Sequence, residues 1–344
     1  MQKAVNFLKN IKPSDDVVII FNNDADGICS CALVEKLFEK TGKKKPYIIP
    51  QPMPMDKNLI QRIKTSLPTK IIFLDLAADQ QESLLKKVKS ICDLLLIDHH
   101  QVTKNMNSSG IIHYNPRFKN PKIYQSTSYL VYKICSEITN MSENLWIAAI
   151  GMIADYELTD SKDIIEEINK RYSIEDPYES VFSKIGDMIS ATRSTKSMSC
   201  EEITDLMVRS RDPDDFIKSD DRLLNSYKEI ANEIAAVVLD AEKGSERTGK
   251  VILYNIKSKY NLRSSISSEL SKRHPNKIVI VYQEVSNRIK VSARSQGEYD
   301  IGKLFQEATA GFDASAGGHE NAAGATVEKK DWDAFKEKLT SLLE

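Results

Sequence analysis

The sequence predicts an α/β protein: a parallel-sheet domain, a helical linker region and a smaller α/β domain. Short apolar runs alternate with segments of helical periodicity between about residues 16 and 155, which is the pattern of a parallel sheet covered on both faces. A second stretch of this kind begins near Gly249, after a charged segment at 161–245 without a clear strand pattern. We therefore place the first domain at 1–190, the linker at 191–245 and the second domain at 246–344.

The elements of the first domain follow from their patterns. Uninterrupted apolar runs of four or five residues read as buried strands, and longer segments with helical spacing read as helices. The expected strands are Val17–Phe21, Ile71–Leu74 and Leu94–Ile97. The expected helices are Gly27–Lys40, Gln81–Ser90, Gln125–Ile138 and Glu143–Asp155.

The later part of the chain is read in the same way. Leu223–Glu242 has the spacing of a long connecting helix. Residues 288–293 alternate with period two, as a strand with one solvated face does. The expected strands are Val251–Ile256, Lys277–Tyr282 and Arg288–Ala293, and the expected helices are Ile301–Ala308 and Trp332–Leu343.

Bulk composition excludes several classes of protein. The 344 residues include 48 Lys plus Arg and 49 Asp plus Glu, so no global signature of polyanion binding exists, although a local basic groove remains compatible with it. The five cysteines form no Cys-x-x-Cys pair, which argues against a disulfide framework and a zinc ribbon. Without a signal-like N-terminus or an apolar window of about 18 residues, we expect a cytoplasmic protein that does not enter membranes.

Acidic residues and histidines follow the apolar runs. Because ligands bind beyond the carboxyl ends of parallel strands, these clusters are expected to converge. Carboxylates and imidazoles together suit Mn²⁺, Mg²⁺ or Zn²⁺. A lone Asp after a strand is usually a cap or turn residue, but four such clusters, with two of only five histidines adjacent, favour a metal-dependent hydrolase. The clusters are Asp24 and Asp26, Asp75, Asp98-His99-His100, and Asp155. Gly27 is expected to let the chain turn sharply into a helix whose N-terminus favours an anion such as phosphate.

These residues resemble a known family. Asp24-Ala25-Asp26-Gly27, Asp75, Asp98-His99-His100 and Asp155 are similar to the four motifs of the DHH phosphoesterases. Gly317–Gly324, with the sequence GGHENAAG, resembles the signature of the accompanying DHHA1 domain. The family includes RecJ-type exonucleases, their archaeal relatives, nano-RNases and cyclic dinucleotide phosphodiesterases. Family-II inorganic pyrophosphatases share the first half, but the DHHA1-like signature argues against them.

The resemblance implies a site for two Mn²⁺ ions, with Mg²⁺ as the alternative, and two-metal hydrolysis of a phosphodiester. The implied ligands are Asp24 and Asp75 for one ion and Asp26, Asp75, His99 and Asp155 for the other, with Asp75 bridging. Asp98 would orient the histidine pair. His100 would contact the scissile phosphate and, with Arg294, stabilise charge in the transition state.

The resemblance also implies a substrate-binding set in the second domain. Ser292 and Arg294 would bind phosphate, and the glycine-rich signature would bind the nucleotide end, since backbone N–H groups approach a phosphate closely where no side chain intervenes. That signature contributes Gly317, Gly318, His319 and Gly324. Arg117 follows an Asn-Pro pair and is a further phosphate ligand or an ordinary surface arginine.

One position departs from the family pattern. RecJ-like and archaeal relatives usually carry Asp or His two residues before the first Asp of the first motif, where this chain has Asn22. Asparagine is a neutral and weaker ligand, so we expect weaker binding of the first metal ion.

Three functions stay open from sequence alone. The first is an exonuclease on single-stranded nucleic acid, preferably DNA and in the 3′→5′ direction, with the active site in the cleft between the domains. It would resemble the archaeal helicase-associated nuclease branch, with a repair helicase or replication protein as partner and a homodimer as a further expectation. The second is a nano-RNase or cyclic dinucleotide phosphodiesterase. The third is a weakly active scaffold in a replication or repair complex.

Overall fold

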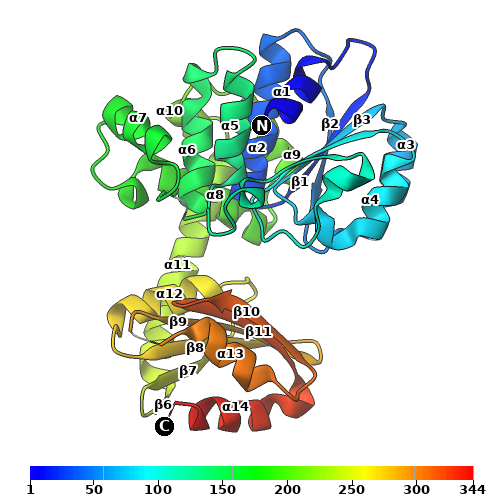
Figure 1. The fold of residues 1–344 in the computed structure, drawn as a ribbon. Helices are drawn as coiled ribbons and strands as arrows, with labels where there is room; N and C mark the ends of the chain where they lie inside the picture. The colour runs from blue at the N-terminus through cyan, green and yellow to red at the C-terminus, as the bar shows by residue number, and fades with distance from the viewer. Residues whose placement is uncertain (57, 157, 298, 344) are drawn as a thin grey trace. The chain divides into compact units, whose positions relative to one another are not determined.

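The computed structural model describes residues 1–56, 58–156, 158–297 and 299–343. The chain forms two compact units, Met1–Tyr227 and Lys228–Glu344, which divide within helix α11 (Asp221–Gly244) (Figure 1). The division falls within the linker that we placed at 191–245, and the boundaries at 190 and 245 stay a prediction. None of the helices in the described residues is long and apolar enough to span a membrane.

The first unit contains a parallel sheet, as predicted, and this sheet has five strands. Its strands are β1 (Val17–Asn22), β2 (Tyr47–Gln51), β3 (Lys70–Leu74), β4 (Asp93–Ile97) and β5 (Ile112–Tyr114). Their order is β2-β1-β3-β4-β5. Because β2 lies on one side of β1 and the later strands on the other, the order reverses between β1 and β3. This reversal is a topological switch point, where doubly wound sheets bind ligands.

Alternate residues of the strands enter two separate cores. Ile19 and Phe21 of β1 pack with the helices on one face, whereas Val18 and Ile20 pack with those on the other. The first face carries α1 (Gln2–Lys9), α2 (Ala25–Lys40), α5 (Thr127–Ser136) and α6 (Leu145–Ala154). The second face carries α3 (Leu59–Ser66) and α4 (Glu82–Lys89). The period of two along each buried strand explains why both faces are apolar.

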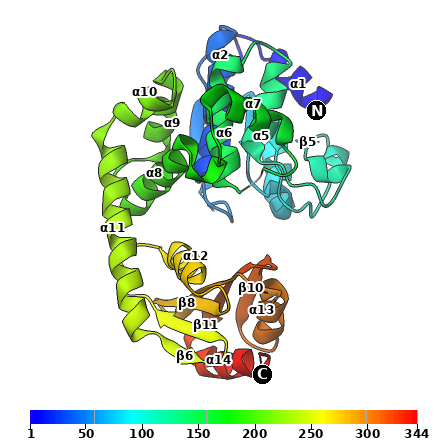
Figure 2. The ribbon, with the colours of Figure 1, turned by 90° about the vertical axis from the view of Figure 1, so that its left-hand side faces the viewer.

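The charged segment at 161–245 is helical throughout its regular elements, all of which the structure describes. It contains α7 (Lys162–Tyr172), α8 (Val181–Thr195), α9 (Cys200–Arg209), α10 (Pro213–Lys218) and α11. α8 packs on α6 and α9 packs on α2, so the early helices of this segment extend the first unit (Figure 2). The absence of strands from these residues agrees with the prediction.

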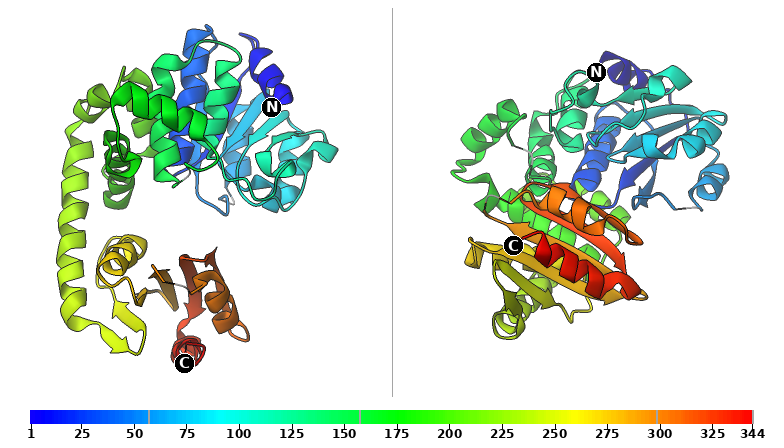
Figure 3. Two further views of the ribbon diagram at one scale, coloured as in Figure 1. Left: turned by 60° about the vertical axis from the view of Figure 1, so that its left-hand side comes forward. Right: turned by 60° about the horizontal axis from the view of Figure 1, so that its bottom comes forward.

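The second unit has a six-stranded mixed sheet in the order β10-β11-β9-β8-β7-β6. The strands are β6 (Glu246–Thr248), β7 (Val251–Asn255), β8 (Ile278–Val285), β9 (Arg288–Ser295), β10 (Ala314–His319) and β11 (Ala322–Glu328). Only the β7–β8 pair among these strands is parallel. Helices α13 (Ile301–Thr309) and α14 (Trp332–Ser341) contact each other over one face (Figure 3). Helix α12 (Arg263–Arg273) packs on β8 and β9 from the other face.

Candidate metal centre

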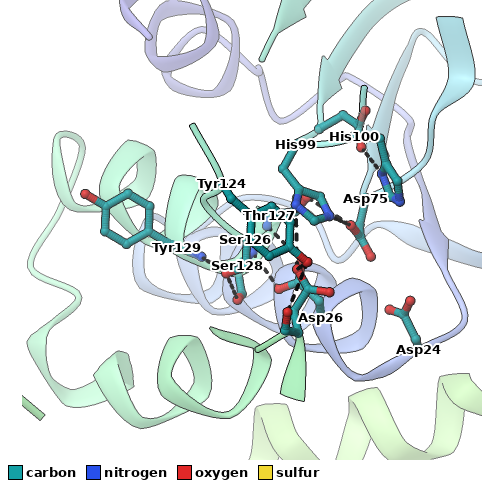
Figure 4. A network of polar contacts seen from close by, with 12 residues as sticks. Asp24, Asp26, Asp75, His99, His100, Tyr124, Ser126, Thr127, Ser128 and Tyr129 are labelled. Carbon is teal, nitrogen blue, oxygen red and sulfur yellow. Dashed lines mark hydrogen bonds and ion pairs between the residues drawn. The ribbon is translucent and has the colours of Figure 1, made fainter. Parts of the chain in front are cut away.

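The predicted acidic and histidine residues of the first unit meet at the carboxyl edge of its sheet. Asp24 follows β1, Asp75 follows β3, and His99 follows β4. Asp155 does not follow a strand: it is the C-terminal cap of helix α6. In Figure 4 the side chains of Asp26, Asp75 and His99 point toward one another, and Asp24 lies beside them. The switch point between β1 and β3 therefore positions the site.

Asp24 is the N-cap of α2. Its Oδ1 accepts a hydrogen bond from the Gly27 N–H at 3.0 Å, and its Oδ2 accepts one from Asn22 Nδ2 at 2.5 Å. Asn22 stands where the family pattern has Asp or His, and its side-chain amide thus donates a hydrogen bond to the Asp24 carboxylate. Gly27 lies inside the helix, not at a turn as we expected. A Cβ atom there would lie 2.1 Å from the Asn22 carbonyl oxygen, so the glycine is required by close packing.

Asp26 is buried against the N-terminus of α5. Its Oδ2 accepts a hydrogen bond from the Thr127 N–H at 2.7 Å, and its Oδ1 accepts one from the Ser128 N–H at 2.9 Å. Burial and the neighbouring Asp24 raise the pKa of Asp26 to about 6, while the Ser128 and Thr127 hydrogen bonds oppose that rise. A helix N-terminus favours negative charge, so α5 holds this carboxylate in place.

Asp75 has a left-handed backbone, with a φ of 58° directly after β3. Its N–H continues the sheet by donating to the Ile97 carbonyl at 3.1 Å, and its Oδ1 accepts a hydrogen bond from Thr127 Oγ1 at 3.1 Å. Burial, together with the Asp24 and Asp26 charges, raises the pKa of Asp75 well above its ordinary value. A buried carboxylate among other carboxylates requires a compensating positive charge in order to stay ionised.

His99 lies between two of these carboxylates. Its Nε2 is 3.2 Å from Asp75 Oδ1, and its Nδ1 is 3.6 Å from Asp155 Oδ2. Nδ1 is buried and has no hydrogen-bond partner among the described residues. Burial and the adjacent His100 lower the pKa of His99 to about 4, so the ring is neutral near pH 7. A neutral imidazole presents a lone pair, which is the form that binds a metal ion.

His100 has the opposite electrostatic environment. Burial alone would lower its pKa, but the hydrogen bond between His100 Nδ1 and Asp98 Oδ1, at 2.7 Å, and the surrounding carboxylates raise the pKa to about 9. His100 is therefore a cation at neutral pH. Its position suits the contact with a negatively charged phosphate that the resemblance implies, and Asp98 orients its ring.

These residues form two groups of possible metal ligands. Within each group, the ligand atoms all lie within 4.8 Å of one another. The groups are Asp75, His99 and His100, and Asp26, His99 and Asp155. Asp24 belongs to neither of the groups found in the described residues. The buried carboxylates and the unpartnered His99 Nδ1 fit a divalent cation, because oxygen and imidazole donors together suit Mn²⁺. In this arrangement Asp26, Asp75, His99 and Asp155 would hold the ion.

The sequence analysis missed a group of side chains around this site. Tyr124 donates its hydroxyl to Asp155 Oδ2 and to the Asp155 carbonyl, each at 3.0 Å, and its ring lies 5.3 Å from the ring of His99. Thr127 and Ser128 bind Asp26, as described above. Their only signal in the sequence is the polar run Gln125–Ser128 at the start of a predicted helix, which a helix cap alone also explains.

Arg117 lies next to the site, and two of its groups are directed at the backbone. Nε donates to the His99 carbonyl at 2.7 Å, and Nη1 donates to the Pro121 carbonyl at 2.8 Å. Asn115 Nδ2 donates to the His100 carbonyl at 3.0 Å. The two residues thereby fix the loop that carries both histidines.

The predicted substrate residues of the second unit share one face of its sheet. In the antiparallel register, Ser292 of β9 lies opposite Gly324 of β11, which lies opposite Gly317 of β10. Directly opposed residues point to the same side, so Arg294, two residues after Ser292, belongs to that side as well. Gly317 and Gly324 are exposed, and Arg294 Nε is buried and has no hydrogen-bond partner in the described part of the chain.

Gly318 and His319 complete the predicted set. Gly318 belongs to the opposite face, where a Cβ atom would lie 2.2 Å from the Ala322 carbonyl oxygen. Gly318 is therefore required for packing of the β10–β11 hairpin. His319 is the last residue of β10, and its side chain lies outside the described part of the structure.

Two family models match the chain. The DHH family N-terminal domain matches residues 16–171, and the DHHA1 domain matches residues 248–344. Together they account for well over half of the sequence, and they contain every predicted site residue. The chain belongs to the DHH/DHHA1 family. The first unit thus contains the DHH domain and the second the DHHA1 domain.

Solved structures share the fold at low sequence identity. Thermus thermophilus RecJ in complex with Mn²⁺ is 15% identical, with a TM-score of 0.78 over 99% of this chain and 54% of that chain. An exonuclease RecJ bound to manganese is 15% identical, with a TM-score of 0.67 over 99% and 93%. A pGpG-specific phosphodiesterase from Vibrio cholerae is 14% identical, with a TM-score of 0.50 over 96% and 98%. The DHH/DHHA1 chain thus spans about half the length of Thermus RecJ. No curated protein matches it in sequence.

Proposed function

We propose that this DHH/DHHA1 protein is a metal-dependent phosphodiesterase that acts as an exonuclease on single-stranded nucleic acid. DNA is the proposed substrate, 3′→5′ the proposed direction, and mononucleotides the products. The observation that supports it best is the convergence of Asp26, Asp75, His99 and Asp155, which brings three carboxylates to a neutral imidazole whose buried Nδ1 has no hydrogen-bond partner among the described residues. The similarity to exonuclease structures that contain manganese supports Mn²⁺ as the ion, with Mg²⁺ as the alternative.

Each proposed site residue of the DHH domain has a role in this reaction. Asp26, Asp75, His99 and Asp155 would hold one metal ion, and Asp24 and Asp75 would hold the other. Divalent ions supply a nucleophile at neutral pH and neutralise charge on the phosphate oxygens. Protonated His100, oriented by Asp98, binds an oxygen of the scissile phosphate, where negative charge develops in the transition state. In the DHHA1 domain, Arg294 and Ser292 bind a further phosphate of the substrate.

A second candidate is hydrolysis of dinucleotides, as by a nano-RNase or a cyclic dinucleotide phosphodiesterase. The Vibrio phosphodiesterase favours it, because that chain and this one cover almost all of each other's length. The third candidate is a weakly active scaffold. A neutral Asn22, hydrogen-bonded to Asp24 at 2.5 Å, favours it, because Asn22 supplies no charge to a first metal ion.

One experiment separates the three. DNA and RNA 20-mers, labelled at the 5′ or the 3′ end, and a labelled dinucleotide are incubated with the protein in Mn²⁺ and in EDTA, with Asp75→Asn as the inactive control. A stepwise ladder in Mn²⁺ supports the exonuclease, and the labelled end gives the direction. Cleavage of the dinucleotide alone supports the second candidate. Absence of any Mn²⁺-dependent product contradicts both enzymatic candidates and leaves the scaffold candidate.

The proposed partner is a repair helicase or replication protein, as in the helicase-associated nuclease branch. A homodimer is a further proposal. Light scattering coupled to size-exclusion chromatography measures the mass of the purified protein, and a value near that of one 38.8 kDa chain would contradict the homodimer.

A further inference from the structure

Two exposed tyrosines stack on each other beside the metal centre. Tyr156 is 74% exposed and Tyr178 is 41% exposed. Their ring centroids are 5.5 Å apart, and the angle between the ring planes is 26°. Most large aromatic side chains on a folded protein bury one face or both, so an exposed pair of parallel rings is a feature that needs an explanation.

Tyr156 is the residue after the proposed ligand Asp155, and its backbone is strained. Its φ is 56°, a left-handed conformation that is uncommon for a bulky residue. The Tyr156 N–H donates to the Ile153 carbonyl at 3.1 Å, which closes the last turn at the end of α6. This conformation leads the chain out of the helix and leaves the ring in solvent. A left-handed residue directly after the last turn is a common way for a helix to end.

Tyr178 comes from a separate short loop that is itself fixed. It lies in the 3₁₀ turn Pro177–Glu179, and the Asp176 side chain accepts a hydrogen bond from the Tyr178 N–H at 2.8 Å. Two segments that are 22 positions apart in the sequence thus bring their rings together. Neither ring belongs to the apolar cores of the first unit.

We propose that Tyr156 and Tyr178 form a stacking platform for the substrate nucleobase next to the scissile phosphate. This inference rests on the proposed function, because it requires a nucleotide at the metal centre. Tyr156 directly follows the proposed ligand Asp155, and consecutive Cα atoms are about 3.8 Å apart, so the platform begins next to the metal centre. Every base has a π-face, so the platform holds nucleotides without selecting a sequence.

The first test compares two substrates. Tyr156→Ala and Tyr178→Ala should each raise KM for a single-stranded oligonucleotide roughly 5- to 150-fold, the effect of losing one base–aromatic stack. An oligonucleotide with abasic residues at its last two positions should be cleaved equally by wild type and variants. Tyr156→Phe keeps the stacking surface and should behave as wild type.

Tyr47 supplies a matched control. It is 54% exposed and is the first residue of β2. It therefore lies at the amino end of the parallel strands, whereas the metal centre lies at their carboxyl ends. Tyr47→Ala should leave KM unchanged. Mn²⁺ titration of Tyr178→Ala should match wild type, because Tyr178 does not adjoin a ligand. The double variant Tyr156→Ala/Tyr178→Ala should lose less than the product of the single effects, since the two rings act as one platform.

The outcomes separate this inference from the proposed function. If wild type cleaves no oligonucleotide, the proposed function fails, and quenching of 2-aminopurine in a terminal position then tests the platform by binding alone. If wild type cleaves but the tyrosine variants keep their KM, the platform is wrong. Equal losses on the base-containing and abasic substrates would show a structural role and also overturn it. Unchanged nucleotide binding together with loss of a protein partner would assign the pair to protein contact instead.

Discussion

Gly151 of α6 leaves the space that the Asp26 carboxylate occupies. A Cβ atom at Gly151 would lie 2.8 Å from Asp26 Oδ1 and 2.3 Å from Ser128 Oγ. Gly151→Ala should therefore displace Asp26 from the α5 amides, lower the stability by about 1–3 kcal/mol through overpacking and weaken Mn²⁺ binding. Thermal unfolding and isothermal titration with Mn²⁺ measure the two effects.

Gly244 at the end of α11 provides the control for this substitution. A Cβ atom there would meet nothing within 4 Å. Gly244→Ala should keep or slightly raise stability, because alanine is the better helix former by up to about 1 kcal/mol. Wild-type Mn²⁺ affinity in Gly151→Ala would show that the space beside Asp26 is not needed for the metal centre.

Asn22→Asp should have opposite effects with and without metal. The substitution removes the Nδ2 donor to Asp24 and adds a negative charge next to Asp24 and Asp26. In EDTA the variant should unfold at a lower temperature than wild type. In Mn²⁺ the extra carboxylate should raise affinity about tenfold, since hard cations bind more tightly as ligand charge increases. Equal affinities would mean that residue 22 does not face the ion.

Asp75→Asn should stabilise the metal-free protein and abolish activity. It removes a buried charge that neighbouring carboxylates repel, and asparagine tolerates the left-handed backbone at this position. In EDTA at pH 8 we expect a melting temperature that is higher by roughly 2–4 °C for each kcal/mol gained. Hydrolysis in Mn²⁺ should fall by at least about 100-fold. A variant that melts below wild type in EDTA would contradict this electrostatic account.

Tyr124→Phe should weaken metal binding although it removes no proposed ligand atom. The lost hydroxyl orients Asp155 through the 3.0 Å hydrogen bond to Oδ2, and loss of such a supporting bond typically lowers metal affinity about 10- to 100-fold. Tyr129→Phe removes a hydroxyl that contacts Asp163 at 3.3 Å, away from the site, and is the control. Equal Mn²⁺ affinities in the two variants would remove Tyr124 from the metal centre.

Glu35→Gln should change how stability depends on pH. Glu35 is buried in α2, and burial raises its pKa to about 7 even though Lys45 lies 3.7 Å away. Because the folded state holds the proton more tightly than the unfolded state, wild type loses stability as pH rises from about 4.5 to about 7. Each unit of difference between the folded and unfolded pKa of Glu35 corresponds to 1.36 kcal/mol, so the loss of stability is at most roughly 3 kcal/mol. Glu35→Gln should therefore unfold at a higher denaturant concentration than wild type at pH 8.

The two proteins should converge near pH 4, where Glu35 is protonated in both states. The exposed Glu39 on the same helix offers a control, and Glu39→Gln should follow the wild-type pH profile. A constant difference between Glu35→Gln and wild type from pH 4 to pH 8 would contradict the role of this proton.

The convergence of the proposed metal ligands could be predicted because each follows a local pattern: an apolar run and then an acid or a histidine. The parallel order of the strands brings those ends together, so local patterns at Asp24, Asp75 and His99 suffice. Strands β2 and β10 are among those that were not predicted. β2 contains Pro50, a residue that an edge strand tolerates but that weakens a strand pattern. β10 contains Gly317 and Gly318, which predict a turn, but its pairing with β11 makes it a strand.

The surroundings of the ligands could not be predicted in this way. Thr127 and Ser128 bind Asp26 across a separation of 101 and 102 residues, and Gly151 is needed only because those side chains meet. Such contacts depend on how α2, α5 and α6 pack, which no local pattern encodes. The arrangement of the substrate residues on one face of the DHHA1 sheet likewise required the register of β9, β10 and β11.

The bond between Asp26 and the start of α5 has a consequence for how the protein acquires its ion. The Thr127 and Ser128 amides compensate part of the Asp26 charge and hold this carboxylate in place without a cation. Loading of the proposed ion would then require no rearrangement of Asp26. Divalent metals differ in intrinsic affinity along a fixed series, so a site with this carboxylate fixed in advance would leave the choice among them to that series and to metal supply.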